Sequence, residues 1–249
     1  MKKNMIMPYR NIAIYCTVTL FLIFSACENN IVQEYESQLN VVAVLNSMNQ
    51  VQHVLVERAY LVDEPSEPPI DDALVVLSGN GFIDTLIFTY ESYRYWTEPF
   101  DLAPLATYEL LVAREGFDTV TAVTTIPGYF VIQYPTYNTT ITLQDTMVIT
   151  RSADAALYGC LFLENVSNLS IFFWYEPNPL DSLIHIPIGE YLDSPPPGYY
   201  AITVVACDSN VYNYYFAADD SIRQCGVTGG VGLFGSTWAA TSSAYLLVE

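Results

Sequence analysis

The chain is built from short apolar runs separated by turn residues, and this pattern sets the strongest limit on its fold. Tyr and Phe are abundant, with 20 and 12 copies among 249 residues, while 14% of the residues are charged. Aromatic side chains suit the pleated, half-buried surface of a β-sheet. Between Leu39 and Ile126, no segment keeps an apolar period of 3.6 residues over three turns. The sequence therefore predicts an all-β fold.

The runs fall into two groups. The first includes Leu39–Leu45 and Tyr108–Arg114, and its spacing is typical of a β-sandwich. The segment Ile126-Pro127-Gly128 ends this group, because proline cannot supply a ladder hydrogen bond. We therefore expect an immunoglobulin-like β-sandwich over residues 39–127 and a second β-rich domain over residues 128–249.

Several segments of the second group are also typical of strands. They include Tyr199–Cys207, Val211–Phe216 and Ala244–Val248. The glycine-rich segment Gly229–Gly235 is followed neither by the Lys-Ser/Thr pair of a phosphate-binding loop nor by a helical run. We expect its glycines to let the backbone approach another strand or form a bulge.

The amino terminus has the pattern of an export signal. The basic residues Lys2, Lys3 and Arg10 precede an apolar core, Ile12–Phe24, which is shorter than the roughly 20 residues of a membrane-spanning helix. The small residues needed by a signal peptidase follow at once. We expect residues 1–26 to be a signal peptide and residues 27–38 to be a tether.

Cys27 gives this signal a particular meaning. The ending Ser25-Ala26-Cys27 resembles the lipobox of bacterial lipoproteins. The resemblance implies that the cysteine sulfur receives a diacylglycerol and that Cys27 becomes the first residue of the mature protein. Two or three acyl chains would hold the protein durably at a membrane, whereas one chain binds only marginally. The alternative is an ordinary secretory signal cut near Ala26, with Cys27 as a thiol.

Cleavage would leave a strongly acidic chain. The whole sequence has eight basic and 27 acidic residues and a net charge of -19. Cleavage removes three of the basic residues, so the mature chain would keep five arginines, no lysine and a net charge of -22. Such a charge repels nucleic acid and anionic lipid headgroups, so we expect neither as a partner.

Three cysteines follow Cys27, and an exported protein can oxidise them. They are Cys160, Cys207 and Cys225. Cys207 and Cys225 flank a short polar segment, so they form the candidate disulfide. The alternative is that all three are buried thiols.

The residues that could support catalysis are few. The two histidines, His53 and His185, lie in apolar runs and have no metal-ligand spacing to a cysteine or to each other. No carboxylate pair is distinguished by its neighbours. We therefore expect no enzymatic activity, no cofactor and no metal site.

Three aromatic residues are candidates for ligand contact. Tyr93, Tyr95 and Trp96 alternate with Arg94, so they either stack on a ligand or fill a sandwich core. Trp174 lies within the apolar run 171–175, where a core position is expected.

Four segments occur in a recognisable order, namely Asp71–Leu77, Tyr108–Val112, Thr124–Pro127 and Gly229–Gly235. In this order, together with Cys27, the chain resembles the Bacteroidota lipoprotein family "domain of unknown function 4249". The resemblance implies an outer-membrane lipoprotein of unassigned activity, with an immunoglobulin-like amino-terminal module and genes beside those of TonB-dependent receptors.

The sequence thus predicts a non-enzymatic, lipid-anchored protein of the outer membrane. We expect it to be a binding or accessory subunit of an uptake complex with a TonB-dependent receptor. A structural or adhesive surface protein is the alternative, and a glycan-acting enzyme is a more distant one.

Overall fold

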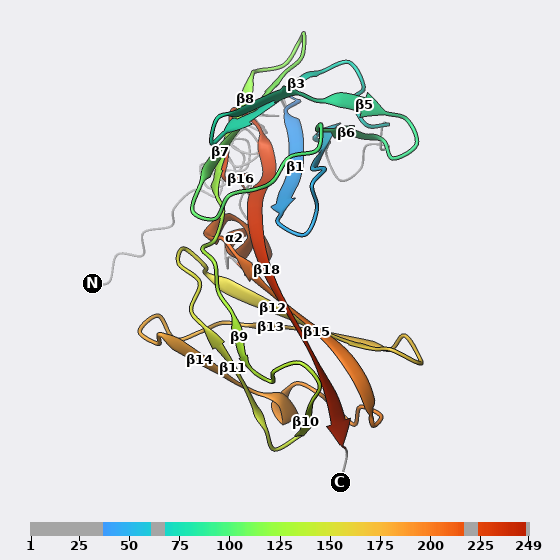
Figure 1. The fold of residues 1–249 in the computed structure, drawn as a ribbon. Helices are drawn as coiled ribbons and strands as arrows, with labels where there is room; N and C mark the ends of the chain where they lie inside the picture. The colour runs from blue at the N-terminus through green and yellow to red at the C-terminus, as the bar shows by residue number, and fades with distance from the viewer. Residues whose placement is uncertain (1–36, 61–67, 217–223, 248–249) are drawn as a thin grey trace, which may run out of the picture. The chain divides into compact units, whose positions relative to one another are not determined.

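Strands form nearly all the regular structure in the computed structural model, which describes residues 37–60, 68–216 and 224–247 (Figure 1). Its elements are β1 (Leu39–Asn46), β2 (His53–Arg58), β3 (Leu74–Gly79), β4 (Phe82–Thr85), β5 (Ile87–Thr89), β6 (Arg94–Trp96), β7 (Thr107–Ala113), β8 (Val120–Thr125), β9 (Ile132–Tyr134), β10 (Thr139–Thr142), β11 (Thr146–Thr150), β12 (Leu157–Glu164), β13 (Ser170–Tyr175), β14 (Leu183–Pro187), the 3-10 turn η1 (Ile188–Glu190), β15 (Gly198–Cys207), α2 (Ser209–Phe216), β16 (Gln224–Cys225), β17 (Val227–Thr228) and β18 (Val231–Leu247). The prediction of an all-β fold is confirmed.

The strands form two β-sandwiches that share one long strand. A ten-stranded sheet has the order β13-β12-β15-β18-β1-β2-β6-β5, and β10 and β16 also pair with β18. Its β1 end packs against the five-stranded sheet β17-β8-β7-β3-β4, and its β13 end packs against the three-stranded sheet β14-β11-β9. Each sandwich has its own hydrophobic core.

The shared strand is β18, the red strand of Figure 1. Its first part pairs in parallel with β1, and its second part pairs antiparallel with β15. The sequence predicted a closing strand at Ala244–Val248, but this strand begins at Val231, inside the glycine-rich segment. Gly232 has φ +123°, and a Cβ there would collide with the carbonyl oxygen of Val41. The prediction that these glycines allow close approach of another strand is therefore confirmed.

The abundance of tyrosine has a structural reason. Tyr95, Tyr108, Tyr158 and Tyr200 are at most 2% exposed, and each hydroxyl group bonds to the backbone. The Tyr158 hydroxyl, for example, accepts the N–H of Ser152 at 2.7 Å. A buried tyrosine thus fills the core with its ring and satisfies a loop backbone group with its hydroxyl.

The segment that contains Val211 is a helix, so its prediction as a strand is wrong. The carboxylate of Asp208 accepts the backbone N–H of Val211 at 2.9 Å, as an N-cap does. The side-chain amide of Asn210 also donates to the carbonyl oxygens of Val123 and Phe234. These bonds fix the start of α2 and override the β preference of its tyrosines.

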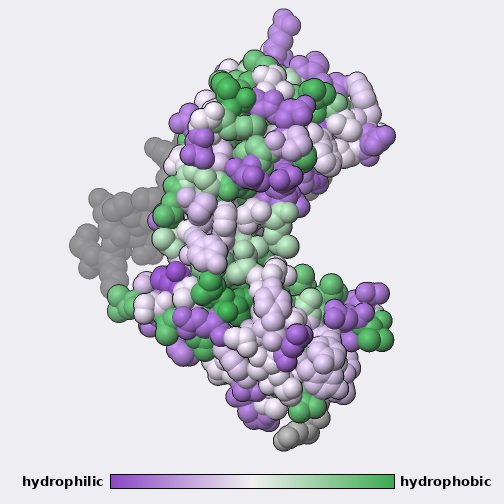
Figure 2. Space-filling model, viewed as in Figure 1, coloured by the Kyte–Doolittle hydropathy of each residue, from purple (hydrophilic) through white to green (hydrophobic). Residues whose placement is uncertain are grey.

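The surface carries both hydrophilic and hydrophobic residues. Figure 2 shows hydrophilic residues beside hydrophobic ones over both sandwiches. Large apolar side chains such as Ile83 and Leu180 are exposed singly at 76% and 91%. Isolated exposed apolar residues are normal, so a binding surface must be sought where several lie together.

Candidate functional site

Pairing of β2 with β6 brings together two residues that the sequence keeps 43 positions apart. His53 lies opposite Trp96, and Val54 lies opposite Tyr95. Because side chains alternate along a strand, Val54 and Tyr95 enter the core while His53 and Trp96 share the other face. The two ring centroids are 5.8 Å apart, and the ring planes are inclined by 33°.

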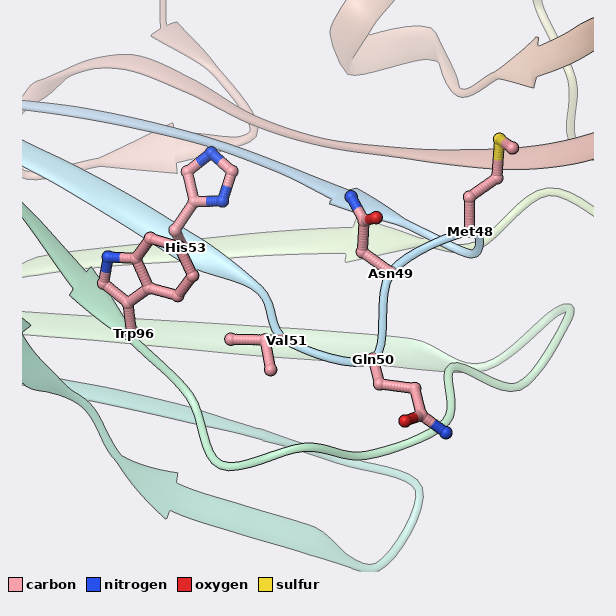
Figure 3. Close-up of a pocket in the computed structure, with 6 residues that line it drawn as sticks. All are labelled: Met48, Asn49, Gln50, Val51, His53 and Trp96. Atoms are coloured by element: carbon pink, nitrogen blue, oxygen red, sulfur yellow. The ribbon is translucent and has the colours of Figure 1, made fainter. Parts of the chain in front are cut away.

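These two rings line an open hollow of about 600 Å³. Figure 3 shows His53 and Trp96 side by side and the residues of the β1–β2 turn along the rest of the wall. The turn contributes Met48, Asn49 and Gln50. The wall therefore combines aromatic rings, a thioether and two amides, which can contact both an apolar surface and hydroxyl groups.

The β1–β2 turn is held in place by the buried amide of Gln52, which is 2% exposed. Its carbonyl oxygen accepts the N–H of Asn46 at 2.9 Å, and its amide nitrogen donates to the carbonyl oxygens of Asn46 and Asn49. Its backbone N–H donates to the hydroxyl of Thr97 at 2.9 Å. The wall of the hollow is thus shaped before any ligand arrives.

The lining residues carry no charge at neutral pH. Burial lowers the pKa of His53 from its ordinary value of 6.5, and the nearby positive charge of Arg94 lowers it further. The imidazole is therefore neutral, and the other lining side chains are thioether, amide, aliphatic and indole groups. In a chain of net charge -19, this hollow is suited to an uncharged ligand.

The structure separates the three aromatic residues predicted to contact a ligand. Trp96 is 38% exposed in the hollow, and Tyr93 is 53% exposed outside it. Tyr95 is 2% exposed in the core and accepts the N–H of Ala73, so it cannot contact a surface ligand. The sequence did not identify Met48, Asn49 and Gln50, because nothing in it pairs this turn with Trp96.

A second hollow, of about 540 Å³, lies at the start of α2. Asp208 is its one buried carboxylate, and its oxygens accept hydrogen bonds from Thr124, Ser236 and Val211. These three partners belong to β8, β18 and α2, respectively. Asp208 therefore fixes the junction of these three elements.

The cysteines lie in apolar surroundings. Cys160 and Cys207 are thiols, and burial raises the pKa of each to about 12, so neither is a reactive nucleophile at neutral pH. Cys207 and Cys225 belong to one small apolar cluster. Their oxidation to a disulfide stays a prediction.

The remaining candidates fall elsewhere. Trp174 packs against the small apolar cluster that contains Cys207, on the face opposite to Phe173, which packs against the core of the second sandwich. His185 is exposed on β14. Cys27, the signal peptide and most of the tether lie outside the described residues.

The described segments contain no group of three or more His, Cys, Asp or Glu side chains placed to hold a metal ion. Among them there is also no helix with the length and apolar character needed to cross a membrane.

No protein-family model matches the chain, and no curated protein gives a significant match. Three amino-terminal domains of the bacteriophage RB49 highly immunogenic outer capsid protein are 11% identical to this chain; the match covers 86% of this chain and 71% of that one, with a TM-score of 0.26. Two fibronectin type III domains of chicken tenascin are 9% identical; the match covers 70% of this chain and 91% of that one, with a TM-score of 0.22. A tetra-tandem repeat of a large adhesion protein is 11% identical; the match covers 84% of this chain and 49% of that one, with a TM-score of 0.25. At these TM-scores the matches carry no statement about function, and the β-sandwich fold rests on the sheets described above.

Proposed function

We propose that the chain is a non-enzymatic, lipid-anchored protein of the bacterial outer membrane that captures an uncharged ligand. The ligand binds in the hollow of Trp96 and His53. The capture serves an uptake complex that includes a TonB-dependent receptor. The observation that carries the binding role is a preshaped hollow without charged lining in a strongly acidic chain.

The chemistry of the lining selects the class of ligand. A neutral saccharide offers an apolar ring face, which packs on an indole, and hydroxyl groups, which bond to amides. Trp96 presents the indole, and its ring nitrogen is already used by the Ser92 hydroxyl at 2.7 Å. Hydrogen bonding to the ligand therefore falls to Asn49, Gln50 and His53.

Binding of neutral oligosaccharides by the full-length protein tests this role. Isothermal titration with malto-, xylo- and cello-oligosaccharides should find one that binds, and an oligosaccharide of uronic acids should not bind. Trp96→Ala should weaken the binding at least about tenfold, equivalent to about 1.4 kcal/mol. The matched control is Tyr93→Ala, which removes an exposed aromatic outside the hollow and should leave the affinity unchanged.

The binding proposal fails if no neutral saccharide binds, or if Trp96→Ala binds as well as the wild type. Retained adhesion of cells to a surface in that case would favour the structural or adhesive alternative. Turnover of a glycan that is lost on changing one carboxylate would favour an enzyme.

The anchor has its own test because it rests on the sequence alone. The intact mass of the protein from the membrane fraction should equal that of a chain starting at Cys27 plus diacylglycerol and acyl groups. Cys27→Ser should lack this mass. An unacylated mature chain would contradict the anchor, and failure of the protein to co-purify with a TonB-dependent receptor would contradict the uptake complex.

A further inference from the structure

Strand β13 is an unprotected edge of the ten-stranded sheet. It pairs with β12 alone among the described strands. Its sequence, Ser170-Ile171-Phe172-Phe173-Trp174-Tyr175, has no charge and no proline. Edge strands usually carry such residues or stay very short, because their free N–H and C=O groups invite pairing with another chain.

The other edges in the described sheets have this protection. β4 contains Asp84, β9 precedes Pro135 and β14 ends at Pro187. The strands β5, β10, β16 and β17 have at most four residues. With six residues, β13 is therefore the edge best suited to receive a further strand.

The free backbone groups of β13 can be assigned. Glu164 donates its N–H to the carbonyl oxygen of Leu169 at 2.8 Å, so this pair is a hydrogen-bonded one. Hydrogen-bonded and non-bonded pairs alternate along an antiparallel ladder. The N–H and C=O groups of Ser170, Phe172 and Trp174 consequently point away from β12.

The side chains beside these groups are already in place. Phe172 is 52% exposed, and its ring meets that of Trp174 edge to face at 4.8 Å. Trp174 also contacts the rings of Tyr215 and Phe216, at 6.1 and 5.9 Å. Gly159 lies opposite Trp174, and a Cβ at Gly159 would come within 2.9 Å of the indole. The indole therefore lies over β12, and the edge needs no rearrangement to accept a strand.

The edge is complementary to itself. In an antiparallel pair centred on Phe172, this residue faces Phe172 of the second copy, and Ser170 faces Trp174 of the second copy. A small side chain thus meets a large one. The acidic Glu176 would face the amide of Asn168 of the second copy, so no like charges meet. Two copies of a chain of net charge -19 repel each other, so a contact between them is favoured where the paired residues carry no like charges.

We propose that β13 pairs with β13 of a second copy of this chain, antiparallel about a two-fold axis at Phe172. The three outward residues of each strand then exchange about six backbone hydrogen bonds. The contact is isologous, so it closes as a dimer and leaves no edge for a third copy.

Sedimentation of the full-length protein in a density-matched nonionic detergent tests the dimer. The wild type should sediment as a concentration-dependent dimer. Phe172→Lys places two like charges opposite each other and should raise the dimer dissociation constant at least about tenfold, equivalent to about 1.4 kcal/mol. Thr203→Lys is the matched control, because Thr203 lies in the same row of the same face, two strands from the edge. It should remain a dimer.

A wild-type monomer at every concentration, a polymer larger than a dimer, or an unchanged Phe172→Lys dimer would each overturn the proposal. Cross-linking keeps the test decisive if Phe172→Lys does not fold. Phe172→Cys in intact membranes should give a covalent dimer with a short bismaleimide, and Thr203→Cys should not. A cross-link from Phe172→Cys to a different protein would instead identify a foreign strand as the occupant and reject the second copy.

Discussion

Two buried carboxylates, Asp208 and Glu164, have pKa values that are shifted in opposite directions. They are 5% and 4% exposed. The pKa of Asp208 is raised above its ordinary value, whereas the pKa of Glu164 is lowered. Burial raises both pKa values and the hydrogen bonds lower both, so the direction at each acid depends on which effect is larger.

Asp208 has partners that a neutral carboxyl group can also satisfy. Burial raises its pKa, and its hydrogen bonds offset part of that rise. Its Oδ2 lies 2.5 Å from the Thr124 hydroxyl, which lies 2.9 Å from the Ser236 hydroxyl, which donates to the carbonyl oxygen of Thr125. A protonated Asp208 can donate to Thr124, and each hydroxyl can then donate to the next acceptor. The network therefore persists without the charge.

Glu164 has partners that all donate to its carboxylate, and such bonds are stronger when it is charged. The Ser167 hydroxyl lowers its pKa most, followed by the Ser167 backbone N–H, and the Val166 N–H contributes as well. Backbone N–H groups only donate, and the Ser167 hydroxyl already accepts the N–H of Leu169. At Asp208 the cost of burying the charge outweighs the hydrogen bonds, whereas at Glu164 the hydrogen bonds from Ser167 outweigh that cost.

Removal of the Asp208 side chain should have the largest effect. Asp208→Ala removes the N-cap acceptor of the Val211 N–H and the hydrogen bonds from the Thr124 and Ser236 hydroxyls, and should lower the free energy of unfolding by about 3 kcal/mol. Asp208→Asn keeps an acceptor for Val211 and can donate to Thr124, so it should cost less than about 1 kcal/mol. Urea unfolding at neutral pH, followed by tryptophan fluorescence, measures both. Equal losses in the two variants would show that the charge itself is needed.

The pH dependence of Asp208→Asn should show a smaller effect with a defined sign. A raised folded-state pKa gives a stabilisation that is full below the ordinary value of 3.8 and is lost as pH rises through the raised pKa. The asparagine variant lacks this contribution. The unfolding free energy of the wild type, relative to the variant, should therefore be highest below the ordinary pKa of 3.8 and fall as the pH rises toward neutral. A difference that rises with pH would contradict the assignment.

The fold was predictable from local patterns, and the pairing was not. The turn residues and the absence of a helical period indicated strands. The segment Val211–Phe216 was predicted as a strand because tyrosines favour strands, and the N-cap at Asp208 was not recognised. Only tertiary packing decides such a case. Likewise, the register that gives β18 to both sandwiches depends on contacts between Gly232 and Val41, 191 positions away.

The candidate site was predictable in part. Trp96 was identified as a possible contact because it alternates with a charged residue. His53 was predicted to be a packed or surface residue of a strand, and its place beside Trp96 follows from the β2–β6 register. Tyr95 could not be separated from its neighbours, because alternation assigns residues to two faces without saying which face is the core.

Substitution of Glu164 should give the smallest effect, with the opposite sign. A lowered folded-state pKa gives a stabilisation that is present above the ordinary value of 4.5 and is lost as pH falls through the lowered pKa. Glu164→Gln should thus unfold at lower urea than the wild type at neutral pH, and the two should converge as the solution is acidified. Glu109→Gln, on the exposed face of β7, is the matched control for loss of one negative charge. If it shifts the midpoint as much as Glu164→Gln, the stabilisation comes from net charge and not from the hairpin donors that bind Glu164.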